Sequence, residues 1–235
     1  QLAAGDGPAA PGAGVGLVRR ARVARTMPTG RLFVVSGPSG GGKTTVVSAL
    51  LKRMPRLMRS VSVTTRPRRP SERQGAHYRF VSPSAFERLR AGDGLLEWAR
   101  VHGACYGTPR APVERALARG REMVLSIDVQ GARQIRRRLG SRAVLVFLKP
   151  PSLRELKARL TKRRTDSPDA IGRRLAAAKR ELACSRWYDA VVVNRRVAET
   201  VARVNAIIVA ERVRPPSPNT GRRAGVRHPD GRTRT

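Results

Sequence analysis

One segment limits the folds open to this chain more than any other, because it joins a predicted strand to a predicted helix through a glycine-rich turn. The turn reads Gly37-Pro38-Ser39-Gly40-Gly41-Gly42-Lys43-Thr44 and matches the pattern GxxxxGK[ST]. The apolar run RLFVVS at 31–36 predicts a buried strand before it. After it, one helical face carries Val46, Val47, Leu50, Leu51 and Met54. This strand–loop–helix order is the context in which the pattern forms a phosphate-binding loop.

The residue types in the loop predict how it holds a nucleotide. Glycines let the backbone turn so that successive N–H groups and the helix N-terminus face the β and γ phosphates. Lys43 adds a cation at those phosphates, and the Thr44 hydroxyl is placed to bind Mg²⁺. The loop indicates a nucleotide and not a reaction, since GTPases, motor ATPases and small-molecule kinases share it.

Strand and helix patterns alternate along the rest of the chain. Further β-rich runs lie at 124–127, 144–148 and 190–193, and helical patterns at 152–163, 168–184 and 198–212. Such alternation predicts a parallel sheet covered by helices. We therefore expect one α/β domain over residues 29–213, built on a P-loop NTPase-type parallel sheet with flanking helices.

The two ends of the chain have a different composition. Residues 1–28 are rich in Gly, Ala and Pro and then in Arg, and residues 214–235 are rich in Pro, Gly and Arg. Neither end shows an apolar period of 2 or 3.6, so we expect disordered basic tails. A transit peptide is a weaker alternative for the N-terminal segment, which is arginine-rich and acid-poor but lacks serine.

The net charge of +33 favours anionic partners, and arginine accounts for 43 of the 49 basic residues. Nucleotide phosphates, nucleic acid and anionic membrane surfaces all fit this charge, and compositional bias explains many of the surface arginines equally well. We expect at most non-specific nucleic-acid contact, made by the basic tails.

Other classes of protein find little support in the sequence. The two cysteines, Cys105 and Cys184, lie far apart without metal-ligand spacing, which argues against a disulfide scaffold or zinc site and favours a reducing cytoplasm. No apolar run approaches the roughly 20 residues that a bilayer requires, so we expect no membrane contact.

Several further motifs occur in order along the chain. They are Ser62-Val63-Thr64-Thr65-Arg66-Pro67, Leu96-Glu97-Trp98-Ala99, Tyr106-Gly107-Thr108 and Ile127-Asp128-Val129-Gln130-Gly131. With the phosphate-binding loop, they make the chain resemble the guanylate kinase family from about Gly30 to Arg212. The resemblance implies the reaction ATP + GMP = ADP + GDP, a step of guanine nucleotide biosynthesis and GMP recycling. It also implies an inserted GMP-binding region at about 60–110, a mobile lid at about 160–170, and Mg²⁺ beside ATP.

The resemblance assigns roles residue by residue. The ATP contacts would be Gly37, Pro38, Ser39, Gly40, Gly41, Gly42, Lys43, Thr44, Thr45 and, at the adenine, Asn194. The GMP contacts would be Ser62, Arg66, Arg69, Tyr78, Glu97, Tyr106, Thr108 and Asp128. Lys43, Arg163 and Arg174 would be catalytic, with both arginines closing over ATP.

Chemistry supports the GMP assignments. Guanidinium groups pair bidentately with phosphate oxygens, and phenol hydroxyls add directional donors. Glu97 stands in an apolar stretch of a chain poor in acids, and a carboxylate accepts from both the N1–H and the 2-amino group of guanine. A salt bridge to a neighbouring arginine is the alternative for Glu97.

Some positions depart from the family pattern. Ser126 stands where an aspartate usually precedes Asp128, Arg195-Arg196 replaces an acidic pair, and basic residues replace both lid glycines. The proline after Arg66 also comes one place early. Fewer acids near the metal would weaken Mg²⁺ placement, and a more cationic lid would slow opening.

Three other functions remain to be weighed. A related kinase acting on a ribose bisphosphate would not need Glu97 and Thr108 together. A non-catalytic interaction module of this family would lack an intact phosphate-binding loop. A nucleic-acid-binding protein would show a recognition motif or basic segments interleaved with aromatics, whereas aromatics total 4% here.

Overall fold

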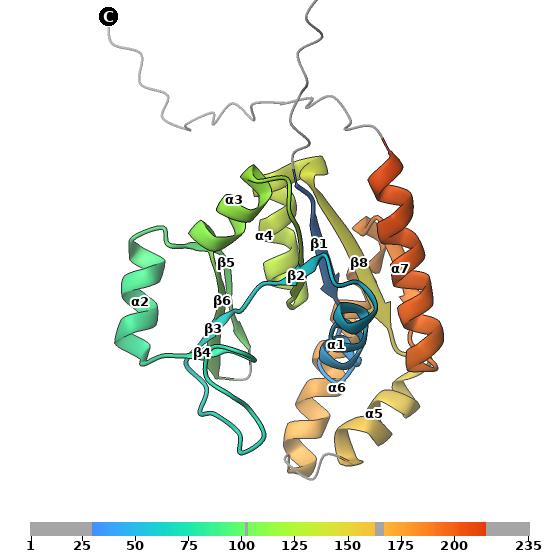
Figure 1. The fold of residues 1–235 in the computed structure, drawn as a ribbon. Helices are drawn as coiled ribbons and strands as arrows, with labels where there is room; N and C mark the ends of the chain where they lie inside the picture. The colour runs from blue at the N-terminus through green and yellow to red at the C-terminus, as the bar shows by residue number, and fades with distance from the viewer. Residues whose placement is uncertain (1–29, 102, 163–166, 215–235) are drawn as a thin grey trace, which may run out of the picture.

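The computed structural model describes residues 30–101, 103–162 and 167–214. The expected tails at 1–28 and 214–235, apart from Arg214, and the expected catalytic residue Arg163 therefore lie outside the described residues. The part described is an α/β structure in which a parallel sheet has helices on both faces (Figure 1). The predicted fold class is thereby confirmed.

Five parallel strands form the main sheet in the order β2-β7-β1-β8-β9. Their bounds are β1 Leu32–Ser36, β2 Leu57–Arg59, β7 Glu122–Ser126, β8 Ala143–Lys149 and β9 Ala190–Val193. Along β1, Phe33 and Val35 pack with helices on one face, and Leu32 and Val34 pack with helices on the other. All four are fully buried, which explains why the strand reads as an unbroken apolar run.

Each face of the sheet has its own pair of helices. Helices α1 (Lys43–Arg53) and α7 (Val197–Val213) pack on the Phe33 face, and α3 (Arg110–Ala118) and α4 (Val129–Leu139) on the Leu32 face. Because these strands are parallel, their carboxyl ends share one edge, and the phosphate-binding loop leaves β1 at that edge. Ligands of open α/β sheets bind at this edge.

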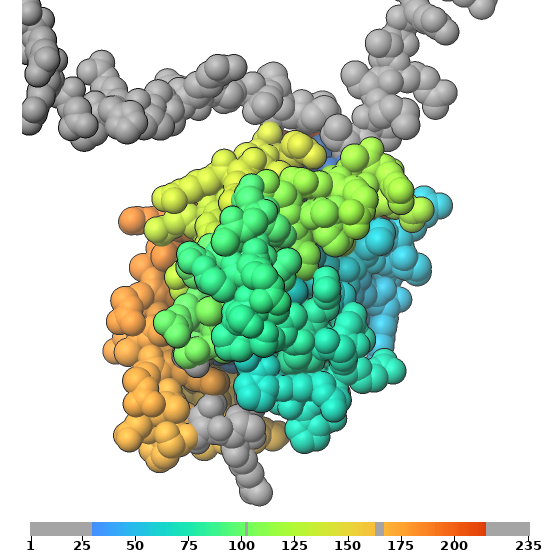
Figure 2. Space-filling view, turned by 90° about the vertical axis from the view of Figure 1, so that its left-hand side faces the viewer, coloured from blue at the N-terminus to red at the C-terminus, as the bar shows by residue number. Residues whose placement is uncertain are grey.

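A smaller unit is inserted between β2 and β7. Its four-stranded sheet has the order β4-β3-β6-β5, with β3 Val63–Thr64, β4 Arg79–Phe80, β5 Leu95–Val101 and β6 Ala104–Pro109. Helix α2 (Pro83–Ala91) covers it through Phe86, which packs on Val63 and Leu95. Figure 2 views the molecule from this side, with the smaller unit in cyan and green facing the viewer.

Helices α5 (Leu153–Lys162) and α6 (Pro168–Ala183) form a hairpin below the sheet (Figure 1). Leu156, Leu160 and Ala178 make a small separate core between them. Two short 3-10 turns, η1 (Gly140–Arg142) and η2 (Cys184–Trp187), complete the elements. Within the ranges described, no helix is both long and apolar enough to cross a bilayer.

Candidate active site

A cavity of about 210 Å³ lies between the phosphate-binding loop and the smaller unit. We call it the central cavity. It collects residues from both parts of the sequence that were expected to bind a nucleotide. Of the expected residues, those lining it are Ser39, Gly40, Gly42, Lys43, Thr44, Thr45, Ser62, Arg66, Arg69, Tyr78, Glu97, Tyr106, Asp128 and Arg174. A single cavity is therefore lined both by residues expected to bind ATP and by residues expected to bind GMP.

The loop itself keeps a tight backbone conformation. Gly42 precedes α1 with φ 90°, a left-handed conformation that favours glycine, and a Cβ there would lie 2.4 Å from Asn194 Nδ2. Lys43 Nζ donates to the carbonyls of Gly37 at 2.7 Å and Pro38 at 3.0 Å. The ammonium thus rests against the loop from which it can reach a bound phosphate.

Asn194 lies behind the loop instead of lining the central cavity. Its side chain is buried, Nδ2 donates to Gly41 O at 2.8 Å, and Oδ1 accepts from Thr200 Oγ1 at 2.9 Å. Both ends of the amide are therefore used inside the protein. One Nδ2–H remains after these bonds, and the adenine contact that the family resemblance implied stays a prediction.

The smaller unit presents two arginines and two tyrosines to the central cavity. Arg66 pairs with both oxygens of Glu72, at 2.8 and 2.6 Å, and the hydrogen bond to Glu72 is the main cause of a raised Arg66 pKa. Its guanidinium lies 5.4 Å from the ring centre of Tyr78, and the ring of Tyr106 lies 6.0 Å from that of Tyr78. Glu72 thus holds the Arg66 fork beside the two phenols.

Glu97 is the buried acid of the site, with 3% of its surface exposed. Oε1 accepts from Thr108 Oγ1 at 2.6 Å, and Oε2 lies against Gly131 of α4, where a Cβ would come within 2.2 Å. Burial raises the pKa of Glu97 to about 7, against the opposing effect of the Thr108 hydrogen bond. The described residues provide no arginine partner in its hydrogen bonds, so the salt-bridge alternative loses its support.

Thr108 is fully buried and stands behind Glu97 instead of lining the cavity. Its hydroxyl hydrogen is committed to the carboxylate. The direct contact between Thr108 and the base stays a prediction, and the contact that the structure shows is the one through which Thr108 holds Glu97.

Asp128 caps helix α4 at the floor of the central cavity. Oδ1 accepts from the Gly131 N–H at 2.8 Å, and Oδ2 from Gln130 Nε2 at 3.3 Å. Burial raises the pKa of Asp128, while the Gly131 hydrogen bond and the charge of Lys43 oppose the rise. The carboxylate is thus fixed between the base side and the phosphate side of the cavity.

Sequence reasoning missed Glu181, which lines the central cavity from α6. Burial raises its pKa, and the charge of Lys43 and the backbone N–H of Ser39 oppose the rise. A signal was available, because Glu181 follows Arg174 by seven residues and two helical turns place both on one face. Arg174 does line the cavity.

The arrangement defines a class: a P-loop protein of the α/β type whose loop faces a second binding region across one cavity. Comparison with known proteins narrows that class. The family model described as guanylate kinase matches residues 29–211, and the chain belongs to the guanylate kinase family.

Curated relatives agree along most of the chain. A guanylate kinase of Chelativorans sp. (strain BNC1) is 52% identical over 185 residues, covering 79% of this chain and 85% of the relative. One from Thermus thermophilus is also 52% identical, covering 79% of this chain and 83% of the relative. The crystal structure of guanylate kinase from Anaplasma phagocytophilum matches with a TM-score of 0.68 at 34% identity, over 80% of this chain and 88% of that one.

Proposed function

We propose that this chain is a phosphotransferase that moves the γ-phosphoryl group of ATP onto GMP, giving ADP and GDP. The observation that best supports this proposal is the central cavity. It lies between a complete phosphate-binding loop and a buried carboxylate with a cluster of arginines and tyrosines. Membership of the guanylate kinase family agrees with this reaction.

On the donor side, the loop N–H groups and Lys43 would hold the β and γ phosphates of ATP. Thr44 lines the cavity with an exposed side chain, and its hydroxyl is a hard oxygen ligand of the kind that Mg²⁺ prefers. The described residues contain no cluster of three His, Cys, Asp or Glu, which fits a cation held largely by phosphates and water. Bound Mg²⁺ would neutralise charge on the donor phosphates.

On the acceptor side, Arg66, Arg69, Tyr78 and Tyr106 would bind the GMP phosphate, and Ser62 lies beside them. An oxygen of that phosphate attacks the γ phosphorus, and the bond from that phosphorus to the β-phosphate oxygen breaks. Direct transfer through a loose transition state requires positioning and charge neutralisation. Lys43 of α1 and Arg174 of α6 both line the cavity and would supply these cations, so no covalent enzyme intermediate is needed.

At the base, Glu97 would accept from the N1–H and the 2-amino group of guanine. Adenine has an unprotonated N1 and no 2-amino group, so the buried carboxylate would stay unpaired. A ribose bisphosphate would not use this carboxylate at all, and an interaction module would not require the loop with Lys43. The free thiols Cys105 and Cys184 agree with a cytoplasmic location. The proposed reaction would belong to purine metabolism.

The test is ADP release measured with AMP, GMP, UMP, CMP and TMP as acceptors. We expect GMP to exceed AMP by at least about a thousandfold in kcat/KM, because buried polar groups left unpaired reject the wrong base. Lys43→Met should abolish transfer while the protein stays folded, as a cooperative melting transition would show. Equal turnover of AMP and GMP, or a tenth of wild-type turnover in Lys43→Met, would contradict the proposal.

A further inference from the structure

A second cavity, of about 380 Å³, lies beside the central one, and one of the basic side chains that line it has no role assigned so far. We call it the side cavity. Arg59 lines it and is the last residue of β2, paired with Val124 of β7. Val124 also pairs with Phe33 of β1, so Arg59 lies level with Phe33 in the sheet, and its side chain reaches the side cavity beside Thr44, the second residue of α1.

The guanidinium of Arg59 is held in place by the neighbouring helix. Its NH2 group donates to Ser48 Oγ on α1 at 2.7 Å, and the side chain is only partly exposed. A guanidinium carries five N–H donors, so this one bond leaves most of the fork available toward the side cavity. Ser48 thus fixes the direction of the charge without neutralising it.

The surroundings of Arg59 favour an anion. The side cavity is shared with residues already assigned to the acceptor phosphate, namely Ser62, Arg66, Arg69 and Tyr78. Among the described residues that line it, Glu72 is the one carboxylate, and it is paired with Arg66 at 2.6 Å. Ser126, which replaces the usual aspartate of the family, lines the same cavity as a neutral hydroxyl. Three arginines therefore face one carboxylate.

We propose that Arg59 is a further substrate-binding residue, which contacts the phosphate of GMP from the side of α1. This assignment rests on the proposed function. Thr44 of the donor side lines both cavities, but Lys43 lines only the central cavity and Arg59 lines only the side cavity, which it shares with the acceptor-side arginines. Arg59 thus serves the acceptor phosphate and leaves the donor phosphates to the loop.

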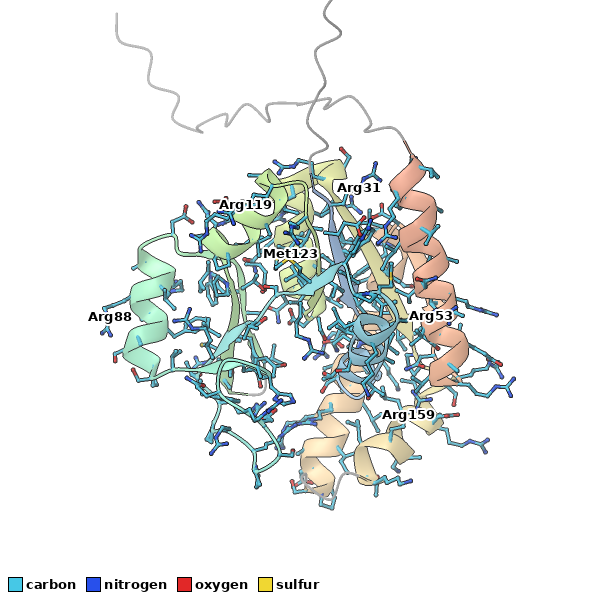
Figure 3. The ribbon with its side chains drawn as sticks, viewed as in Figure 1. Arg31, Arg53, Arg88, Arg119, Met123 and Arg159 are labelled. Atoms are coloured by element: carbon cyan, nitrogen blue, oxygen red, sulfur yellow. The ribbon has the colours of Figure 1, made fainter. Side chains whose placement is uncertain are left out.

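The test compares GMP with guanosine, which presents the same base and ribose without the phosphate. Calorimetric titration of both ligands would use the full chain, Arg59→Gln and Arg59→Lys. The control is Arg88→Gln, an exposed arginine on the outer side of α2, away from the main sheet (Figure 3). Arg59→Gln should lose about tenfold in GMP affinity, the worth of one charged hydrogen bond, and keep its guanosine affinity. Arg59→Lys should lose less.

Steady-state kinetics give a second readout. The KM for GMP should rise in Arg59→Gln while the KM for ATP stays constant. An equal loss for guanosine and GMP, or a GMP affinity within twofold of Arg88→Gln, would overturn the assignment of Arg59. If the wild-type chain itself neither binds nor phosphorylates GMP, the proposed function fails together with this inference.

Discussion

At the scale of single residues, Glu97 shows how burial and specificity depend on each other. The carboxylate is enclosed and its pKa is raised to about 7, mainly because burial disfavours the charged form. The folded pKa exceeds the unfolded value of 4.5, so the protonated group contributes stability below about pH 4.5 that is lost as the pH rises to about 7. The N1–H and 2-amino donors of guanine would give the ionised Glu97 carboxylate hydrogen bonds in place of the water contacts that it loses on burial.

This coupling predicts a pH dependence of binding. Guanosine affinity should fall below pH 7, by up to about tenfold at pH 6, because the site must first lose the proton from Glu97. Guanosine is preferred to GMP as the ligand because its lack of phosphate removes a second titration from this range. Calorimetry between pH 5.5 and 8 measures the effect. Glu97→Gln should bind weakly with no such slope, and a slope that survives in this variant would assign the proton to another group.

Gly131 provides a second prediction at this scale. Its missing side chain leaves room for Glu97, since a Cβ would lie 2.2 Å from Glu97 Oε2 and 3.3 Å from Asp128 Oδ1. Gly131→Ala should therefore displace the carboxylate and raise the KM for GMP by about tenfold or more, while the KM for ATP changes little. Gly172→Ala is the matched control, because a Cβ at this helical glycine meets nothing within 4 Å. Equal kinetics in both variants would contradict the steric role.

At the scale of elements, three segments hold the phosphate-binding loop from behind. Asn194 after β9 bonds Gly41, Thr200 of α7 bonds Asn194, and Arg159 of α5 donates to Asn194 O at 2.9 Å. A Cβ on Gly40 would lie 2.8 Å from Leu160 Cδ2, so the loop also packs closely on α5. Figure 3 shows Arg159 on α5, the helix that leads toward residues 163–166. The phosphate-binding loop is therefore in direct contact with α5 of the helical hairpin.

Asn194 should then act as a positioning residue for the loop. Asn194→Ala leaves the Gly41 carbonyl without its side-chain donor, which costs about 1–3 kcal/mol for a buried group, and leaves the Thr200 hydroxyl with the Arg196 carbonyl as its acceptor. We expect a lower melting temperature and a KM for ATP that rises more than the KM for GMP. Asn205→Ala, at a half-buried asparagine of α7, is the control. An effect confined to melting temperature, with unchanged KM values, would show that Asn194 is purely structural.

The elements also differ in how far the sequence predicts them. Strands at 31–36 and 190–193 and the helix at 198–212 follow from local periodicity, and the structure confirms them as β1, β9 and α7. The two-residue strands β3 and β4 escape prediction, because only their pairing with distant residues makes them strands. In the site, sequence motifs indicated Glu97 and Arg66. Arg59 belongs to no motif, and its proposed role is recognised from its place in the cavity that the tertiary fold forms.

At the scale of the whole molecule, the charge is spread over the sequence and not concentrated at its ends. Residues 1–28 and 214–235 contain ten of the 43 arginines, so most of the positive charge lies between them. In the described part, several of these arginines are paired, as in Arg212 with Glu122 and Arg31 with Glu211. Acids are too few to pair the rest, with 16 against 49 basic residues. The domain itself is therefore expected to attract polyanions.

This distribution leads to a prediction for a chain shortened to residues 27–213. The shortened chain should fold and should match the full chain within about twofold in kcat at moderate salt, because every proposed site residue lies inside it. The family match over residues 29–211 supports the same limits. On heparin it should still bind and should elute at a moderately lower salt concentration, since counterion release depends on the number of contacting cations. Loss of folding or of most activity would contradict the proposed 29–213 domain, and loss of all heparin retention would assign polyanion binding to the tails alone.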